Sequence, residues 1–241
     1  MYLENNTILI TGGTSGIGYE LGKALLGKNN RVILLGRNEH KLETLQKVGF
    51  ETIRCDLGNP EDVEAAAVYI QNHFPDLNML FNNAGVQYNY VFTESLAPSK
   101  NIIDEININL TGQVLLTQLL IPILSTAKSA LIVNTTSGLG AYPKSDGLVY
   151  SASKAAMRNF NRGLKDLLKN SNIDVVEFIP PVTETGMTKG RDTKKMSASE
   201  LVKKVIPQIE KKRAIATVGS IRAFLWISFL FPGLAYKILT K

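Results

Sequence analysis

Short apolar segments alternate with longer amphipathic segments along almost the whole chain. The apolar segments are rich in Val, Ile and Leu, show little apolar–polar alternation, and fall at residues 7–10, 31–35, 52–55, 77–81, 130–135, 173–179 and 214–218. Strands of this kind are buried on both faces, which is typical of a parallel sheet covered by helices. The pattern therefore predicts a sheet of about seven parallel strands.

The segments between these strands carry helical signals. Helices are predicted at about 17–28, from Asn38 towards 48, from Pro60 onwards, through 102–120 and from Tyr150 to about 168. Asn38 suits an N-cap, and Pro60 suits the first turn of a helix, where no backbone N–H is needed. Right-handed crossovers between parallel strands then give an α/β fold: a Rossmann-type, doubly wound sheet with helices on both faces. With no repeat or linker visible, residues 1–241 are expected to form a single domain.

Composition narrows the class of protein. Of the 241 residues, 44% are hydrophobic and 20% are charged, which allows a full core and excludes a disordered chain. The single cysteine, Cys55, cannot form an internal disulfide, and two histidines leave no convincing zinc cluster. The N-terminus shows no basic segment followed by a long apolar one, so a cytoplasmic location is expected.

Charge is divided unevenly along the chain. Residues 187–241 hold 12 Lys and Arg against 3 Asp and Glu, whereas residues 1–186 hold 15 against 18. The apolar C-terminal segment at 221–241 lies in this basic region, and its run at 223–231 is too short to cross a bilayer. The pattern favours a helix packed on the body or on a second subunit, with shallow membrane attachment as the alternative. No nucleic-acid partner is expected, because the basic residues follow no familiar recognition element.

A glycine-rich segment follows the first predicted strand and directly precedes a helix. It reads Thr11-Gly12-Gly13-Thr14-Ser15-Gly16-Ile17-Gly18. Glycine lets the backbone approach a pyrophosphate closely, and a helix N-terminus offers unpaired N–H groups to its charge. A tight turn would explain glycines alone, but this placement favours a dinucleotide-binding loop.

The end of the second predicted strand indicates which dinucleotide is preferred. An acidic residue there would hold the ribose 2′-hydroxyl of NAD, whereas an arginine accommodates the 2′-phosphate of NADP. The chain reads Leu35-Gly36-Arg37-Asn38, without an acid, and the planar guanidinium of Arg37 suits a phosphate. A solvated surface arginine is the alternative. The sequence favours NADP(H) over NAD(H).

Four further motifs follow in order. They are Asn82-Asn83-Ala84-Gly85 after the fourth predicted strand, Asn109 within Ile108-Asn109-Leu110-Thr111-Gly112, Ser137 thirteen positions before Tyr150, and Tyr150-Ser151-Ala152-Ser153-Lys154. Together with the glycine loop they resemble the short-chain dehydrogenase/reductase family over nearly the whole chain. Each motif is weak alone, but the ordered set on the expected elements is specific.

The resemblance implies an oxidoreductase that interconverts a carbonyl and an alcohol of a small molecule. Tyr150 would donate a proton during reduction and accept it during oxidation. Lys154, one helical turn away, would lower the pKa of the phenol and hold the nicotinamide ribose. Ser137 would hydrogen-bond the substrate oxygen, and Asn109 would position a water in a proton relay behind Lys154. The alternative is an NADP(H)-binding redox sensor without turnover.

The resemblance also implies which residues contact the cofactor. The pyrophosphate loop would comprise Gly12, Thr14, Ser15, Gly16, Ile17 and Gly18. Asp56 would lie beside the adenine, Asn83 near the adenosine ribose and Thr185 near the carboxamide. The segment before Thr185 departs from the family pattern, because Pro181 replaces a glycine and removes a backbone N–H.

Substrate selection is expected in three segments. Residues 186–200, which are polar and contain Gly186 and Gly190, suit a mobile lid; residues 87–98 and 138–148 would line other walls. Tyr88, Tyr90, Phe92 and Tyr142 would either form an aromatic pocket or pack at the surface.

The resemblance extends to assembly and to one branch of the family. It implies a homodimer or homotetramer formed through the long helices that contain Asn109 and Tyr150. Residues 83–87, the Pro180-Pro181 pair and the tail containing Pro232 resemble a bacterial branch. Its members include oxidoreductases associated with teichoic-acid D-alanylation genes.

Overall fold

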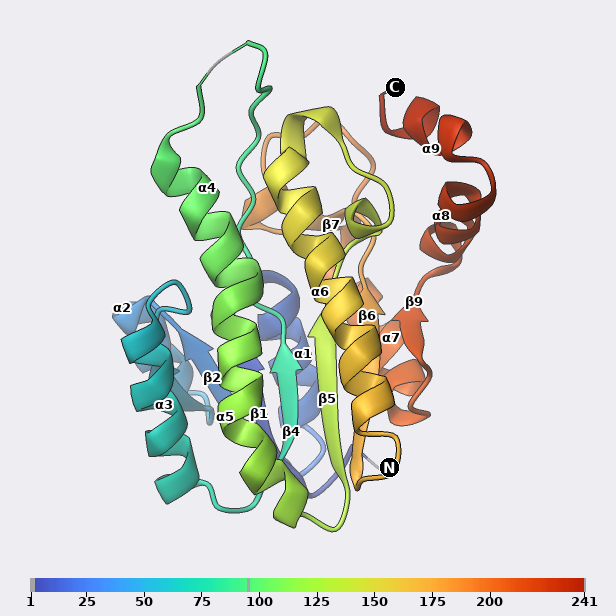
Figure 1. Cartoon of the computed structure of the whole chain (residues 1–241). Coiled ribbons are helices and arrows are strands. Elements are labelled where there is room, and N and C mark those ends of the chain that lie inside the picture. The colour runs from blue at the N-terminus through green and yellow to red at the C-terminus, as the bar shows by residue number, and fades with distance from the viewer. Residues whose placement is uncertain (1–2, 95, 241) are drawn as a thin grey trace.

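A seven-stranded parallel sheet forms the centre of the molecule, of which the computed structural model describes residues 3–94 and 96–240 (Figure 1). The strands are β1 (Thr7–Thr11), β2 (Arg31–Gly36), β3 (Glu51–Arg54), β4 (Leu77–Asn82), β5 (Ala130–Thr135), β6 (Ile173–Ile179) and β9 (Ile215–Thr217). Each of the seven predicted strands is confirmed, and all neighbouring pairs are parallel.

The strand order is β3-β2-β1-β4-β5-β6-β9. The chain thus winds outward in one direction from β1 to β3, then returns to the centre and winds the other way from β4. The crevice at the carboxyl ends of β1 and β4, where the order reverses, is the usual ligand site of such sheets. The glycine loop follows β1 and the Asn82-Asn83 motif ends β4, so topology brings both to this crevice.

Helices cover both faces of the sheet, as the sequence predicts (Figure 1). One apolar cluster packs α1 (Gly16–Leu26) and α7 (Ala198–Glu210) against one face. The other packs α3 (Pro60–His73), α5 (Gly112–Thr126) and α6 (Leu148–Leu167) against the opposite face. The helix α2 (Glu39–Gln46) begins after Asn38, whose side chain accepts a hydrogen bond from Lys41 N at 2.9 Å.

The helix predicted at 102–120 is longer and is interrupted by one π-helical turn. It comprises α4 (Ser99–Ile106), the turn η1 (Asn107–Thr111) and α5. By length and composition, residues 99–126 are apolar enough to span a membrane. However, Leu116, Leu120 and Leu124 are fully buried against the sheet. The apolar character of α5 is therefore explained by its place in the core.

Two elements at the carboxyl end of the sheet enclose its crevice. A two-stranded ribbon of β7 (Thr183–Glu184) and β8 (Met196–Ser197) bounds the segment that the sequence predicts as a lid. The C-terminal segment forms α8 (Gly219–Leu230) and α9 (Pro232–Leu239), which pack on each other. α8 also contacts the short 3-10 turn η2 (Gly138–Gly140) that follows β5, so both helices lie beside the crevice (Figure 1).

Candidate active site

A cavity of about 1090 Å³ lies at the carboxyl ends of the central strands. It runs from the glycine loop to the N-terminal turn of α6 and on to α8 and α9. Small-molecule sites usually measure about 300–1,000 Å³, so this cavity has room for a dinucleotide beside a second molecule. The predicted site residues that line it are Gly12, Thr14, Ser15, Gly16, Ile17, Arg37, Asp56, Asn83, Ser137, Tyr150, Lys154 and Thr185. Two predicted residues, Gly18 and Asn109, are not part of its lining.

The glycine loop has the shape that the sequence predicts. Gly12 and Gly16 have φ values of 65° and 56°, in the left-handed region that favours glycine. A Cβ on Gly12 would lie 2.8 Å from Ala84 Cα, and one on Gly16 would lie 2.9 Å from Thr185 Cγ2. Gly18 instead packs against the loop from behind, where a Cβ would lie 2.5 Å from Asn83 Nδ2. Gly18 thus allows α1 to approach the turn closely.

The start of α1 offers a site for an anion. Ser15 is the N-cap residue, but its hydroxyl does not accept a hydrogen bond from the first turn, and that turn contains no acidic side chain. The backbone N–H groups of the first turn of α1, and the positive end of the helix dipole, therefore face the cavity without a side-chain partner in the described chain. This arrangement fits the pyrophosphate of a dinucleotide.

The ends of β2 and β3 bring Arg37 and Asp56 together. Arg37 Nη1 lies 3.6 Å from Asp56 Oδ2, and both side chains are partly exposed at the cavity. Exposed ion pairs contribute about 0–1 kcal/mol, so a phosphate can compete with Asp56 for the guanidinium. The position of Arg37 therefore fits a ribose phosphate.

Thr11 joins the ends of β1 and β4, a role that the sequence analysis did not assign. Its Oγ1 accepts hydrogen bonds from Asn83 N at 2.9 Å and Ala84 N at 3.0 Å. The side chain of Asn83 makes a further hydrogen bond, because its Nδ2 donates to Thr11 O at 3.2 Å. These bonds hold Asn83 at the cavity wall.

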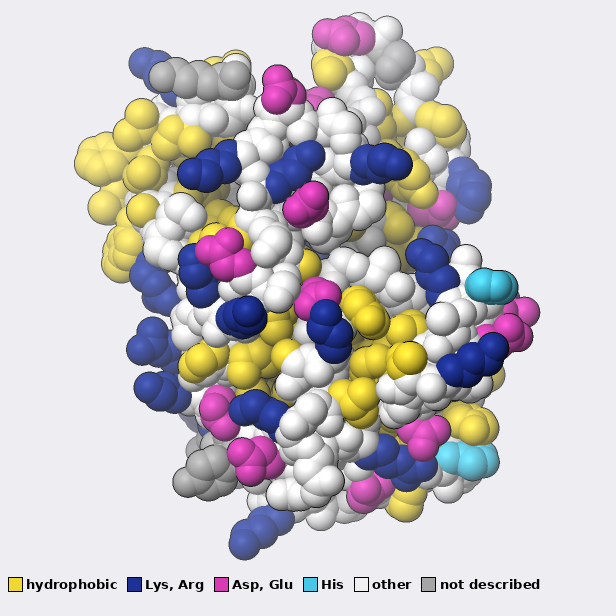
Figure 2. All heavy atoms as spheres, turned by 180° about the vertical axis from the view of Figure 1, so that it is seen from behind, with side chains coloured by type: hydrophobic (Ala, Val, Ile, Leu, Met, Phe, Trp, Pro, Cys, Tyr) yellow, Lys and Arg dark blue, Asp and Glu magenta, His cyan; other side chains and the backbone are white. Residues whose placement is uncertain are grey.

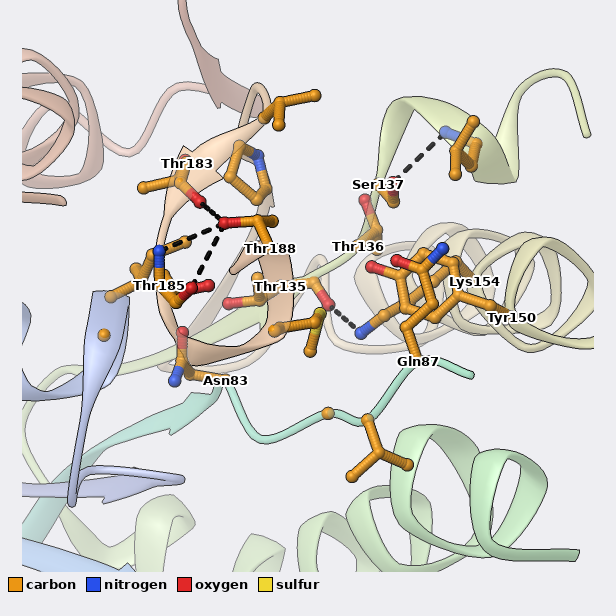
Figure 3. A pocket seen from close by; sticks show the side chains of 18 of the residues that line it. Asn83, Gln87, Thr135, Thr136, Ser137, Tyr150, Lys154, Thr183, Thr185 and Thr188 are labelled. Carbon is orange, nitrogen blue, oxygen red and sulfur yellow. Dashed lines mark hydrogen bonds between the residues drawn. The ribbon is translucent and has the colours of Figure 1, made fainter. Parts of the chain in front are cut away.

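Ser137, Tyr150 and Lys154 converge on one wall of the cavity (Figure 3). Ser137 follows β5, whereas Tyr150 and Lys154 lie one turn apart on α6. The hydroxyl of Ser137 lies close enough to the phenol of Tyr150 to lower its pKa. Lys154 Nζ donates to Thr135 O at 3.0 Å and lies 5.9 Å from the centre of the Tyr150 ring. Both Tyr150 and Lys154 are buried, so their protonation is controlled by this small group of neighbours.

Burial shifts the pKa values of these two groups in opposite directions. Burial raises the pKa of Tyr150, although the nearby hydroxyl of Ser137 and the charge of Arg191 partly oppose this. Burial lowers the pKa of Lys154 to about 8. Near neutral pH the phenol therefore holds its proton while Lys154 is largely charged. Further positive charge, as on an oxidised nicotinamide, would favour the phenolate.

A buried oxygen beside Lys154 offers a further contact for a ligand. Thr135 is one of the residues that line the cavity, and its buried Oγ1 has no hydrogen-bond partner among the described residues. Buried polar atoms are normally paired, so an unpaired one at a cavity wall indicates a ligand contact. Together with Lys154, it fits the hydroxyl groups of a ribose.

Asn109 lies behind this wall in the π-helical turn. Its side chain accepts from Val86 N at 2.8 Å and donates to Val86 O at 2.9 Å and Ser153 Oγ at 3.2 Å. Gly85 lines the cavity and lies close to both polar groups, since a Cβ there would lie 3.2 Å from Asn109 Oδ1 and 3.5 Å from Lys154 Nζ. The side chain thus ties the 84–86 loop to α6, and the proton-relay role of Asn109 stays a prediction.

A buried ion pair supports the segment that carries Ser137. Arg158 Nε, on α6, lies 2.8 Å from Glu177 Oε1, on β6, although its N–H is not well directed at that oxygen. Thr136 Oγ1 donates to the same Oε1 at 2.7 Å. The pair therefore links α6, β6 and the residue directly before Ser137. Sequence reasoning missed it, because no local pattern matches an arginine to a glutamate nineteen residues later.

Threonines shape the segment in which Pro181 departs from the family pattern. Thr183 Oγ1 donates to Pro181 O at 2.8 Å, and Thr188 Oγ1 donates to Thr183 O at 2.6 Å. Thr185 N donates to Thr188 Oγ1 at 3.2 Å (Figure 3). Thr185 also lies close to Gly16, where a Cβ would be 2.9 Å from Thr185 Cγ2. Side-chain hydrogen bonds thus fix this backbone, and Thr185 lines the cavity as the sequence predicts.

The aromatic residues proposed for the substrate pocket pack elsewhere. Tyr88 N and Tyr90 OH donate to the buried carboxylate of Glu105 at 2.8 and 3.2 Å. The rings of Tyr90 and Phe92 stack on each other, 5.6 Å apart. The apolar end of the cavity is instead lined by Val182, Met187, Ile221, Phe224, Ile238 and Leu239.

Comparisons with known sequences identify the family of the chain. A family model described as short chain dehydrogenase matches residues 6–196. The chain is 39% identical over 195 residues to the uncharacterized oxidoreductase DltE of Bacillus subtilis, across 80% of this chain and 77% of that protein. It is 32% identical over 199 residues to serine 3-dehydrogenase of Agrobacterium fabrum, across 81% of this chain and 79% of that protein.

Comparisons with solved structures agree on the fold. A short chain dehydrogenase from Burkholderia cenocepacia in complex with NADP has a TM-score of 0.87 at 23% identity and covers 100% of both chains. A short chain dehydrogenase/reductase from Burkholderia phymatum in complex with NAD has a TM-score of 0.84 at 22% identity, covering 97% of this chain and 96% of that one.

Proposed function

This chain belongs to the short-chain dehydrogenase family, and we propose that it interconverts a carbonyl and an alcohol with NADP(H) as its preferred cofactor. It is an oxidoreductase of that family, and its similarity to DltE confirms the expected bacterial branch. One observation carries the proposed reaction. Ser137, Tyr150 and Lys154 share a wall of the same cavity that contains the glycine loop and the start of α1.

The arrangement of these groups supports a proton-transfer mechanism. When bound, the nicotinamide supplies or accepts a hydride. During reduction, the protonated phenol of Tyr150 gives its proton to the oxygen of the substrate, where negative charge develops. Ser137, whose hydroxyl lies near the phenol of Tyr150, holds that oxygen beside the phenol. The ammonium of Lys154 stabilises the phenolate that remains. Oxidation of the alcohol runs through the same contacts in reverse.

Arg37 supports the preference for NADP(H). We expect Arg37→Ala to weaken NADPH binding about 10- to 100-fold and to change NADH binding less than threefold, because only NADPH offers a phosphate to the guanidinium. Paired fluorescence titrations of both cofactors measure this difference. Arg31→Ala is a matched control, since Arg31 pairs with Glu51 away from the cavity. Equal losses for NADPH and NADH would exclude the 2′-phosphate contact.

The buried lysine makes the reaction sensitive to pH. The pKa of Lys154 lies at about 8, so kcat/KM for carbonyl reduction should fall by up to tenfold per pH unit above that value. Alcohol oxidation should rise over the same range, because the Tyr150–Lys154 pair must lose one proton before the phenol oxygen can accept the proton of the alcohol. Steady-state rates in both directions between about pH 6 and 10 provide the test. A reduction rate that stays flat to pH 10 would contradict the proposed role of Lys154.

Two further features belong to the proposal. Residues 186–200 would act as a lid, because Met187, Arg191 and Thr193 line the cavity from this segment. The long helices that contain Asn109 and Tyr150 would form the contact between subunits of a homodimer or homotetramer. Light scattering of the purified protein distinguishes these assemblies from a monomer.

A further inference from the structure

The helix α8 is apolar on all sides, and yet it has no buried residue. It contains Ile221, Phe224, Leu225, Trp226, Ile227, Phe229 and Leu230. Every residue of α8 is more exposed than the buried core residues of the described chain. A helix that is hydrophobic all round is normally covered all round, either by a protein core or by lipid. The described residues therefore leave part of this apolar surface uncovered.

The two sides of α8 face different surroundings. On its inner side, Ile221 and Phe224 line the active-site cavity and lie near Gly138, directly after Ser137. On its outer side, Trp226 and Phe229 are 63% and 78% exposed. We call the outer surface the α8–α9 face, made of Trp226, Phe229, Leu230, Phe231, Leu234 and Tyr236, all exposed. Hydrophobic side chains gather where these helices lie, at the upper left of Figure 2. The face thus adjoins the wall of the cavity.

An arginine-lined hollow lies beside this face. It measures about 650 Å³ and lies between α6 and α8, and its lining includes Arg158, Arg162, Arg222, Trp226 and Phe229. Glu177 offsets the charge of Arg158, but no carboxylate is part of the described lining. Arg162 and Arg222 therefore give the hollow a positive charge beside exposed aromatic rings. A phosphate attached to an apolar chain matches both features.

Charge favours a bilayer over a second copy of the chain as the occupant. The helices α8 and α9 carry Arg222 and Lys237 and no Asp or Glu, and Arg162 lies across the hollow from Arg222. A two-fold contact through the α8–α9 face would bring these basic residues together, because each copy presents the same patch. An anionic lipid surface complements them, and Trp226 and Tyr236 are residue types enriched where protein meets headgroups.

We propose that the α8–α9 face inserts into the headgroup region of an anionic lipid bilayer, with a lipid phosphate bound in the hollow between Arg162 and Arg222. The active-site cavity then opens beside the bilayer through the wall formed by Ile221 and Phe224. The substrate class that follows is a membrane-partitioned carbonyl or alcohol with an apolar chain. This second step rests on the proposed oxidoreductase function, whereas binding to the bilayer does not.

Co-sedimentation of the full chain with vesicles tests the bilayer contact. The native protein should pellet with phosphatidylcholine vesicles that contain phosphatidylglycerol, and less with phosphatidylcholine alone. Trp226→Gln/Phe229→Gln should lower the partition coefficient at least tenfold, because two large apolar side chains no longer enter the bilayer. The control Val68→Gln/Leu167→Gln, at exposed apolar positions on α3 and α6, should pellet as the native protein does.

A second pair of variants tests the lipid phosphate. Arg162→Gln/Arg222→Gln should reduce the preference for phosphatidylglycerol roughly thirtyfold, since each cation near an anionic surface contributes about 1 kcal/mol. The control Lys165→Gln/Lys169→Gln removes two exposed charges from the same helix region and should change the preference for phosphatidylglycerol little. If both pairs lose binding equally, the hollow has no special role and the phosphate site is excluded.

Two results would overturn the bilayer contact. One is a native protein that does not pellet with anionic vesicles. The other is a Trp226→Gln/Phe229→Gln variant that pellets equally well. If light scattering then shows that this variant dissociates a native dimer, the α8–α9 face is a contact between copies of the chain. None of these outcomes depends on turnover, so they leave the proposed oxidoreductase function unaffected.

The substrate class has its own measurement. With NADPH and a series of aldehydes of increasing chain length, kcat/KM should rise by up to about fourfold for each CH₂ that enters the apolar end of the cavity. Phe224→Ala should flatten this rise, so that kcat/KM falls more for long aldehydes than for short ones. A native kcat/KM that does not change with chain length would exclude the apolar substrate class, even where the vesicles bind.

Discussion

Replacing Tyr150 with Phe should lower kcat for carbonyl reduction about 10²- to 10⁴-fold, the usual contribution of general acid catalysis, and leave NADPH binding within threefold of native. The substitution removes one hydroxyl and keeps the buried ring beside Lys154. No other phenol lines the described cavity, so no second proton donor of this kind can take its place. Steady-state kinetics and NADPH fluorescence titration separate the two effects.

Tyr88→Phe is the matched control. It removes the hydroxyl of a tyrosine that lies outside the described cavity lining, where its OH is 3.5 Å from Asp104 Oδ2. Its kcat should stay close to native. A Tyr150→Phe variant that retains more than a third of native kcat would exclude Tyr150 as the proton donor.

Replacing Arg158 with Met should lower the free energy of unfolding by about 3–5 kcal/mol, because it leaves the buried carboxylate of Glu177 without its charged partner. Both side chains are less than a tenth exposed, so water cannot replace the lost contact. The double variant Arg158→Met/Glu177→Leu should recover most of the stability, since it removes both charges. Denaturant unfolding of the three proteins measures the coupling between the two residues.

The same double variant separates stability from catalysis. It removes the carboxylate to which Thr136 donates at 2.7 Å, and Thr136 directly precedes Ser137. We therefore expect its kcat to stay about tenfold below native, with little change in the KM for NADPH, because Ser137 is less well positioned. Full recovery of kcat along with stability would mean that the pair only supports the fold.

The strands and the positions of the proposed catalytic residues could be predicted because their signals are local. Seven apolar runs mark the strands, and each depends only on its own residues. The parallel sheet then places the carboxyl ends of all its strands at one edge. Ser137, which follows β5, and Tyr150, on α6, are therefore expected at the same edge without any prediction of the distance between them. The glycine loop could be predicted for the same reason, because Gly12 and Gly16 adopt positive φ values that glycine favours whatever its neighbours are.

Features that depend on contacts between distant segments could not be predicted. The pairing of Arg158 with Glu177 arises only when α6 packs on β6. Tyr88 and Tyr90 suggest an aromatic substrate pocket by residue type. In the structure both residues instead donate hydrogen bonds to the buried Glu105 on α4. The apolar end of the cavity comes from α8 and α9, because the return of the C-terminal segment to the crevice has no local signal.

Transfer of deuterium tests the central claim most directly. The native protein and Tyr150→Phe would each be incubated with NADPH deuterated at the reactive carbon and with a panel of aldehydes and ketones, including long-chain ones. Mass spectrometry of the products would locate the isotope. The proposed reaction predicts deuterium on the carbinol carbon with the native protein and little or none with Tyr150→Phe. Tight NADPH binding by the native protein, without transfer to any carbonyl, would contradict it and favour a redox sensor.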